Sequence, residues 1–489
     1  MLIRRLYELI VAVLLVITIL EAISLLTWTL FPLLGDTGTI FTALDTDAFD
    51  LLAPFSPLLL VLGLYAWIFE GASVFGRHTR LVHRTVTLLV KARDGLLRWI
   101  IGSAPRNEFG NGPLRNPRIW LFLISAFAVL VVYIPYRSDL NPGLALVGTD
   151  TPLYVGWIDQ MRMNSLTQAM SYALGIANHG SRPFLLIPLY LVTLASGVSS
   201  VQSVKYLPLL LAPLSALSSY VLMRTGSRSE TIALLAMLFT VTSFPVTVGM
   251  WAGYYANWLA LIEANLFFAS LLLVCRSFSS LQYTMFVGLS LALLLTHPWT
   301  WALVIVVALA FCLSMWKTIR GRGIMTLLAP MLATDLIVDA LKTYTFGSWG
   351  LATYIGVRVS GSGPLQSAGL WQNLIQAMVF TYDGLLSNAP ILLLAFVAVL
   401  NLRFSDAFDR LILLWISIPS LIFPILESYN QTRIIYDLPI PILASVGAIL
   451  FVSRFNRTKR LPWLVLVPTL LFNTNYALRA MTHLVTGFQ

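Results

Sequence analysis

The residues best suited to chemistry lie in a polar stretch, residues 136–183, of a chain that is otherwise strongly apolar. At its centre is the segment Gly148-Thr149-Asp150-Thr151-Pro152-Leu153-Tyr154, and Asp159 follows it. A carboxylate at a membrane surface can deprotonate a hydroxyl acceptor or hold a divalent metal ion. Asp150 is therefore the first catalytic candidate. The same segment also suits the start of a helix, with Asp150 as its cap and Pro152 in the first turn.

Further polar side chains are expected at the same membrane face. Arg182, His297 and Arg433 can bind a phosphate leaving group, arginine through its two-pronged guanidinium. A divalent metal is the cofactor that these residues allow, with Asp150, Asp159 or His179 as ligands. The candidates for the lining of a substrate pocket are Tyr154, His179, Tyr254, Tyr255, Asn257 and Glu263.

Several of these residues also have a purely structural explanation. His297 can end a helix before Pro298, and Arg433 can reach along its helix to the interface. Tyr254 and Tyr255 are of the type that anchors helices at headgroup level. Glu263 can pair with a neighbouring helix. The argument for function is that all of them converge on one face.

The elements that must position these residues are membrane-spanning helices. The chain is 58% hydrophobic and 11% charged, whereas a soluble domain is about a quarter charged. Each apolar run of about 20 residues can cross a hydrocarbon core of about 30 Å. The expected fold class is all-α, a polytopic membrane protein with about 13 spans. These are expected at 7–33, 51–70, 119–135, 205–223, 229–247, 253–275, 281–296, 299–316, 324–341, 387–402, 410–427, 435–452 and 461–474.

The loop charges predict how the chain is oriented. Arg4 and Arg5 place the N-terminus on the cytoplasmic side, and the acidic loop 35–50 lies outside. An odd number of spans then leaves the C-terminus outside. The single span 119–135 after the basic inner segment 72–118 places the candidate site outside as well. The net charge of +10 reflects basic inner loops rather than nucleic-acid binding. Cys275 and Cys312 predict neither a disulfide nor a metal framework.

Two segments are expected to lie in the membrane without crossing it. Phe184–Ser196 is short, contains Pro188 and conflicts with the loop charges if it crosses, so it is interpreted as half-inserted or re-entrant. The segment 72–118 places basic residues every seven positions beside an apolar face, which is typical of a helix on the inner leaflet. The alternative for this basic segment is a topology determinant alone.

Short motifs in the chain resemble the GT-C superfamily of membrane glycosyltransferases. This superfamily includes the catalytic subunit of oligosaccharyltransferase, protein O-mannosyltransferases and the lipid A aminoarabinose transferase. The Gly148–Tyr154 segment with Asp159 resembles their acidic first outer loop, and His297-Pro298 resembles a later outer histidine. Gly253-Tyr254-Tyr255-Ala256-Asn257 is similar to a Gly-Tyr-Tyr-acidic segment, but Ala256 and Asn257 stand where the family has acids. The remaining similar stretches are Arg182-Pro183-Phe184 leading to Leu189-Tyr190, and Arg433 followed by Leu438-Pro439-Ile440-Pro441.

The resemblance implies a GT-C-like membrane core at 119–452, preceded by an N-terminal two-helix addition at 1–118 and followed by a C-terminal span and tail at 453–489. It implies a glycosyltransferase that moves a sugar from a polyprenyl-phosphate donor to a glycan, lipid or protein acceptor at the extracytoplasmic face, amid membrane lipids. Asp150 would be the base, Asp159 its support, and Arg433, His297 and Arg182 the phosphate-binding residues.

Two other classes of function stay open on the sequence alone. A transporter or lipid flippase would use buried charges such as Glu263, Asp335 and Asp339. A non-catalytic subunit of a membrane complex would instead present the basic inner helix to partners.

Overall fold

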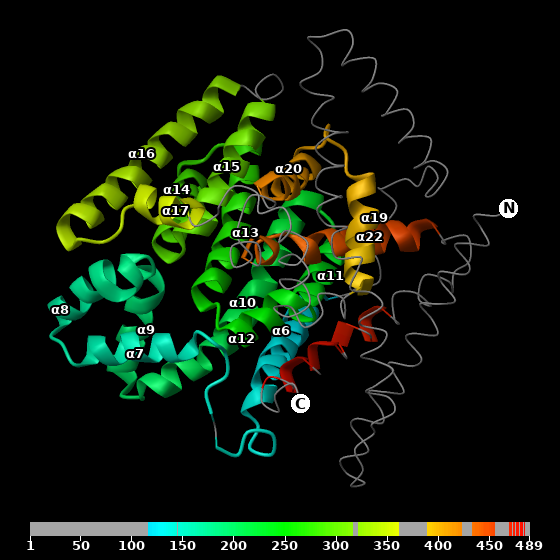
Figure 1. Ribbon diagram of the computed structural model, residues 1–489. Helices are drawn as coiled ribbons and strands as arrows, with labels where there is room; N and C mark the ends of the chain where they lie inside the picture. Colours follow the sequence, from blue (N-terminus) through cyan, green and yellow to red (C-terminus); the bar gives the residue numbers. More distant parts are fainter. Residues whose placement is uncertain are drawn as a thin grey trace.

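The computed structural model describes residues 116–143, 145–315, 321–360, 389–422 and 433–454, together with parts of 469–484. Every regular element in these ranges is a helix (Figure 1). The all-helical class is therefore confirmed for this part of the chain. The first two expected spans, the basic segment 72–118 up to residue 115, and most of the expected span 461–474 lie outside the described residues.

Four of the described helices are long and apolar enough to cross a membrane, which identifies membrane-protein character. They coincide with the expected spans from 119–135 to 253–275. The further expected spans, and hence their total number, stay predictions. The four are α6 with its extension η4 (Pro117–Tyr136), α10 (Ser200–Ser227), α11 with α12 (Glu230–Val241 and Phe244–Ala252), and α13 (Tyr255–Arg276).

The remaining helices are shorter or less uniformly apolar. On the N-terminal side of α10 lie α7 (Thr151–Arg162), α8 (Leu166–Ser171), the short turns η5 (Tyr172–Ile176) and η6 (Ala177–Gly180), and α9 (Pro183–Ser196). After α13 come α14 (Ser280–Thr296), α15 (Pro298–Ser314), α16 (Gly321–Phe346), α17 (Leu351–Ser360), α19 (Ala389–Asn401), α20 (Ala407–Ile422) and α22 (Ile440–Arg454).

Local sequence explains where many of these helices begin and end. Ser199 caps α10 in a reciprocal arrangement with Gln202, which satisfies backbone donors at the helix start. Proline occupies the first turn of α6, α9 and α15, where its missing N–H costs nothing. Gly253 ends α12 with φ 67°, in the left-handed region that glycine tolerates. The turn at Gly253 lets α13 start again at Tyr255.

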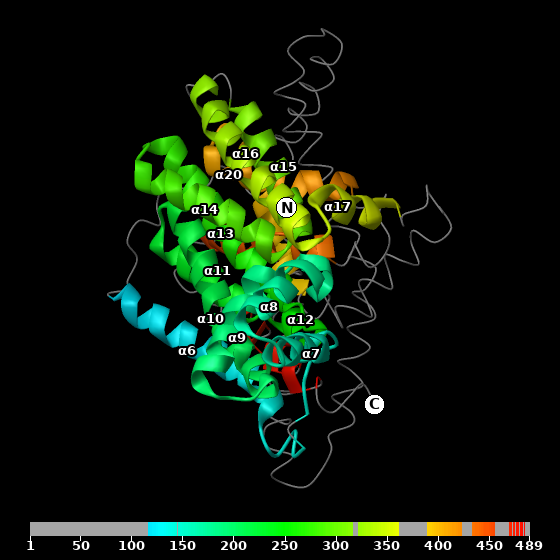
Figure 2. The ribbon, with the colours of Figure 1, turned by 90° about the vertical axis from the view of Figure 1, so that its left-hand side faces the viewer.

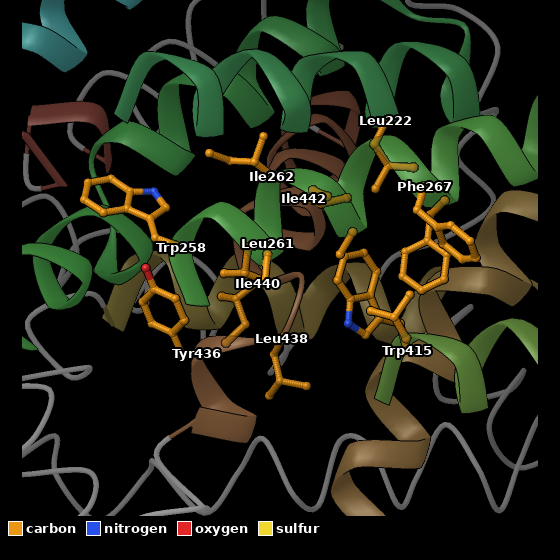
Figure 3. Packing of buried hydrophobic residues seen from close by; sticks show 14 of the residues in the cluster. Leu222, Trp258, Leu261, Ile262, Phe267, Trp415, Tyr436, Leu438, Ile440 and Ile442 are labelled. Carbon is orange, nitrogen blue, oxygen red and sulfur yellow. The ribbon is translucent and has the colours of Figure 1, made fainter. Parts of the chain in front are cut away.

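The core lies around α13, which is buried on nearly all sides by α10, α14, α15 and the 433–442 segment. Figure 3 shows Tyr436 beside Trp258 and Ile440 beside Leu261. The Tyr436 hydroxyl donates to the carbonyl of Pro245 at 2.7 Å, which ties this segment to α12. A helix that is mostly apolar and buried on nearly all sides is expected at the centre of a bundle.

The helices α7, α8 and α9 gather at one end of the molecule, beside α10 and α12, in both ribbon views (Figures 1 and 2). With 14 residues, α9 is about 21 Å long at 1.5 Å per residue. That is shorter than a hydrocarbon core of about 30 Å. The half-inserted placement of Phe184–Ser196 fits this length and stays a prediction.

Candidate functional site

The segment 148–150, which carries Asp150, docks directly on the junction between α12 and α13. The backbone N–H groups of Thr149 and Asp150 donate to the carbonyls of Trp251 and Ala252 at 3.1 and 3.0 Å. The two segments touch through glycines: a Cβ on Gly148 would lie 3.1 Å from the Cα of Gly253. This close approach requires glycine, because both residues also have positive φ, 101° and 67°.

Asp150 occupies the cap position of α7 without acting as a side-chain cap. It directly precedes Thr151 at the start of the helix, is half-buried, and makes no capping hydrogen bond. The prediction of an Asp150 cap is therefore right for the position and wrong for the side-chain bond. Tyr255 supports this loop instead, with its hydroxyl 3.0 Å from the Thr151 hydroxyl.

Tyr154 and Arg182 form a buried pair next to this loop. The Arg182 Nη1 donates to the Tyr154 hydroxyl at 2.7 Å, and the backbone N–H of Ala256 donates to the same oxygen at 3.2 Å. The guanidinium also lies over the rings of Tyr154 and Trp157, 5.4 and 5.6 Å from their centroids. Arg182 is only 5% exposed, and its Nε is buried without a hydrogen-bond partner among the described residues.

The charges around Tyr154 show which predicted residues come together. Burial raises the pKa of Tyr154, and the neighbouring charge of Arg182 opposes that rise. Asp150 raises the same pKa and Arg433 lowers it, so both charges lie within electrostatic range of the phenol. Asp150, Arg182 and Arg433 thus all lie within electrostatic range of one buried tyrosine, although they are far apart in the sequence, and Arg182 contacts it directly.

Arg433 is held in a second buried cluster, which includes Tyr254 and Asn257 near the start of α13. Its Nη1 contacts the Asn257 side-chain oxygen at 3.4 Å and the His297 Nε2 at 3.3 Å. Its guanidinium carbon lies 4.5 Å from the centroid of the Tyr254 ring, in a cation–π contact. Arg433, His297 and Asn257 are each at most 2% exposed. These four predicted site residues thus form one cluster.

Sequence reasoning missed two members of this cluster, Thr300 and Asp437. The Asn257 Nδ2 donates to Asp437 Oδ1 at 2.6 Å, and the Thr300 hydroxyl donates to Asp437 Oδ2 at 3.0 Å. The His297 Nδ1 lies 2.7 Å from the Thr300 hydroxyl oxygen. One signal was available: Asp437 is a lone carboxylate in an apolar run, one helical turn after Arg433.

Glu263 lies beside this cluster rather than in it. Its Oε1 accepts from the Thr296 hydroxyl at 2.9 Å, in the residue before His297. Its Oε2 is buried with no hydrogen-bond partner among the described residues. The interhelical pairing foreseen for Glu263 is therefore present, between α13 and the end of α14.

Asp159 and His179 lie apart from the two clusters in different ways. Asp159 is nine residues after Asp150, about 13 Å further along α7 and on its opposite side. The exposed His179 ring stacks on Trp349 at 3.8 Å, and its backbone is left-handed, with φ 59°. No three His, Cys, Asp or Glu residues in the described part of the chain are grouped to hold a metal ion.

Comparison with known proteins adds no relative to this picture. No protein-family model matches the sequence, and no curated protein matches it. The functional argument therefore depends on the residues and their geometry.

Proposed function

We propose that this protein is a GT-C-type glycosyltransferase that moves a sugar from a polyprenyl-phosphate donor to an acceptor at the extracytoplasmic membrane face. The observation that carries the proposal is the docking of the Asp150 loop on the α12–α13 junction, at Trp251 and Ala252, shortly before Asn257. This docking assembles a carboxylate, two guanidinium groups and an imidazole around Tyr154 and Tyr254. An acid and several cations at one site are what transfer from a phosphate-linked donor requires.

Each side chain has a distinct role in the proposed reaction. Asp150 takes the proton of the acceptor hydroxyl while its oxygen attacks the anomeric carbon of the sugar. The bond from that carbon to the donor phosphate breaks, and the configuration inverts. Arg433 and Arg182, with His297, stabilise the negative charge that collects on the leaving phosphate. Tyr254 and Tyr154 hold the two guanidinium groups in place.

The membrane placement forms part of the same proposal. About 13 spans would carry the chain from a cytoplasmic N-terminus to an extracytoplasmic C-terminus. The site would then lie where polyprenyl-phosphate sugars are used, at the membrane face opposite the basic loops. Asp150 requires no metal for its role as a base. The proposed reaction can therefore proceed with the described residues alone, and a divalent ion would supplement them.

The test is a turnover assay with purified full-length protein in proteoliposomes. Wild type and Asp150→Asn receive a panel of polyprenyl-phosphate sugars and alcohol acceptors, with and without a divalent metal. Asp139→Asn is the matched control, because Asp139 is an exposed carboxylate of the same outer stretch that pairs with Arg137. We expect transfer by wild type and Asp139→Asn and a loss of about 100-fold or more in Asp150→Asn. Transfer by Asp150→Asn at the wild-type rate would overturn the assignment of the base.

Glu263 favours transport as a second candidate function. A buried carboxylate oxygen without a described partner, within a helix of membrane length, is a feature of ion and substrate pathways. The same proteoliposomes test this alternative when they are loaded with a pH-sensitive dye and short-chain lipid-linked sugars. Sugar or proton movement that Glu263→Gln abolishes, with no sugar transfer by wild type, would favour the transporter.

A further inference from the structure

Asp437 is a carboxylate acceptor in the Arg433 cluster, and its contacts there run in a fixed direction. Arginine only donates hydrogen bonds and a carboxylate only accepts them. Every hydrogen bond on a path from Arg433 to Asp437 must therefore have its donor on the Arg433 side and its acceptor on the Asp437 side. Two routes connect them. One runs through the amide of Asn257, and the other through the ring of His297 and the hydroxyl of Thr300.

The amide route has a single consistent assignment. Arg433 donates to the Asn257 oxygen at 3.4 Å, and the Asn257 Nδ2 donates to Asp437 Oδ1 at 2.6 Å. A flipped amide would turn its N–H toward the guanidinium and its oxygen toward the carboxylate, which is repulsive at both ends. Asp437 therefore fixes which end of the amide faces Arg433.

The histidine route fixes a tautomer in the same way. Arg433 can donate to His297 Nε2 only when that nitrogen carries a lone pair, so the proton of a neutral ring lies on Nδ1. Nδ1–H then donates to the Thr300 hydroxyl oxygen at 2.7 Å, and this hydroxyl donates to Asp437 Oδ2 at 3.0 Å. The Thr300 backbone N–H also points at Nδ1, at the same 3.3 Å as the Arg433 contact with Nε2, and a neutral ring cannot accept at both nitrogens. The shorter contact of 2.7 Å between Nδ1 and the Thr300 hydroxyl favours the proton on Nδ1.

We propose that Asp437 is a positioning residue that sets the tautomer of His297 and the amide orientation of Asn257, and thereby holds Arg433 in place for an anionic phosphate group of the substrate. Asp437 and Arg433 lie one helical turn apart, at 433–437, so the residue that is positioned and the residue that positions it move together. This inference rests on the proposed function only for the phosphate; the tautomer is a property of the protein alone.

The first measurement is the protonation of the His297 ring nitrogens by nitrogen NMR. Full-length protein carrying ¹⁵N-histidine is examined in lipid nanodiscs, and His297→Gln assigns the signal among the five histidines of the chain. Wild type should show a proton on Nδ1 and none on Nε2. In Asp437→Asn the new amide donates to Thr300, the hydroxyl turns to Nδ1, and the proton should move to Nε2.

Two variants keep this test sharp. Thr300→Val removes the relay with little change in side-chain volume, so it should also move the proton to Nε2 even if Asp437→Asn folds poorly. Asp335→Asn is the matched control, because it alters another buried carboxylate that accepts from Trp301 at 3.0 Å, outside the cluster. A wild-type proton on Nε2, or no change in either relay variant, would overturn the proposal.

Kinetics with a polyprenyl-phosphate sugar then separate the two proposals. Asp437→Asn should lower kcat/KM by about 10- to 100-fold, as happens when the partner that orients a functional histidine is removed. The double variant with Thr300→Val should be no worse than Asp437→Asn alone, since both act through one path. If the expected tautomer shift occurs and wild type transfers no sugar, the positioning role stands and the glycosyltransferase proposal falls. If wild type is active and the kcat/KM losses of Asp437→Asn and Thr300→Val multiply in the double variant, the two residues do not act through one path and the positioning role is wrong.

Discussion

The Arg182 guanidinium is stabilised by aromatic and neutral partners among the described residues. Arg182 is bonded to a phenol and lies over two rings, and no carboxylate among the described residues forms an ion pair with it. A buried cation without a carboxylate retains its attraction for an anionic ligand. The cost of burying Arg182 is offset by its phenol bond and by the desolvated cation–π contacts.

Arg182→Lys should weaken the use of a phosphate-linked donor while the protein stays folded. Lysine keeps the charge but loses the planar group that lies over Tyr154 and Trp157. The loss of one charge-assisted bond corresponds to about 10-fold or more in kcat/KM. Arg162 is exposed at the end of α7, so Arg162→Lys is the matched control and should have the donor kinetics of wild type. Unchanged donor kinetics in Arg182→Lys would remove Arg182 from the phosphate site.

Tyr154→Phe should lower stability and change its dependence on pH. The substitution leaves the Arg182 Nη1 and the Ala256 N–H without their acceptor, at a cost of about 1–3 kcal/mol in the free energy of unfolding. The raised pKa of Tyr154 in the folded protein stabilises it fully below about pH 10, and this contribution is lost as the pH rises through that pKa.

Thermal unfolding in detergent from pH 8 to 11 measures both effects. The midpoint of Tyr154→Phe should lie below that of wild type at pH 8, and the difference should shrink as the pH rises above 10. A constant difference over that range would contradict the assignment of a buried, protonated phenol.

Among the elements, the docked segment 148–150 and the α12–α13 junction that it contacts act as one unit. Gly148 and Gly253 let two backbones meet, and the two hydrogen bonds from Thr149 and Asp150 lock the contact. The loop carries Asp150, while the junction leads into the segment with Tyr254 and Asn257. The distance between the candidate base and the phosphate-binding cluster therefore depends on this contact.

Gly148→Ala should disrupt the loop and lower activity. An added Cβ would lie 2.7 Å from the Met250 carbonyl oxygen, and φ of 101° is strained for alanine. Gly156→Ala on α7 is the control, because a Cβ there meets nothing within 4 Å. We expect a turnover loss of at least about tenfold only for Gly148→Ala, since small displacements of catalytic groups are costly. Equal activities of the two alanine variants would show that the loop does not position the base.

The positions of the long helices could be predicted from the sequence, whereas the partners within the site could not. Apolar runs and flanking Pro, Ser and Gly are local properties, so the expected span 205–223 falls inside α10, and the expected span 253–275 begins two residues before α13 and ends within it. The Arg433 and His297 positions followed from their place near span ends. Thr300 and Asp437 escaped notice because their role depends on a contact across 137 residues, which no local pattern encodes.

For the whole molecule, the expected topology predicts which loops face which compartment. Asp139 is exposed just after α6, Ser196 ends α9, and Arg228 follows α10. If α9 does not cross and α10 does, Asp139 and Ser196 share a side and Arg228 lies on the other. The half-inserted interpretation of α9 is therefore tested by the side of Ser196.

Single cysteines at these three positions, in a variant with Cys275 and Cys312 replaced by alanine, measure the arrangement. A membrane-impermeant maleimide added to intact cells should label Asp139→Cys and Ser196→Cys. Arg228→Cys should react only after permeabilisation. Labelling of Ser196→Cys only in permeabilised cells would show that α9 crosses, and the span assignment would then need a different count.

The wide separation of the cluster along the chain has a consequence for how the protein is made. Asn257 leaves the ribosome 180 residues before Asp437, and His297 leaves it 136 residues before Arg433. In the proposed topology, α13 and the start of α15 would enter the bilayer before the 433–437 segment that supplies the final partners of Asn257 and His297. Polar groups exposed to lipid are costly. In that topology the nascent protein would pass through a stage in which its future site is incomplete and open to the insertion machinery.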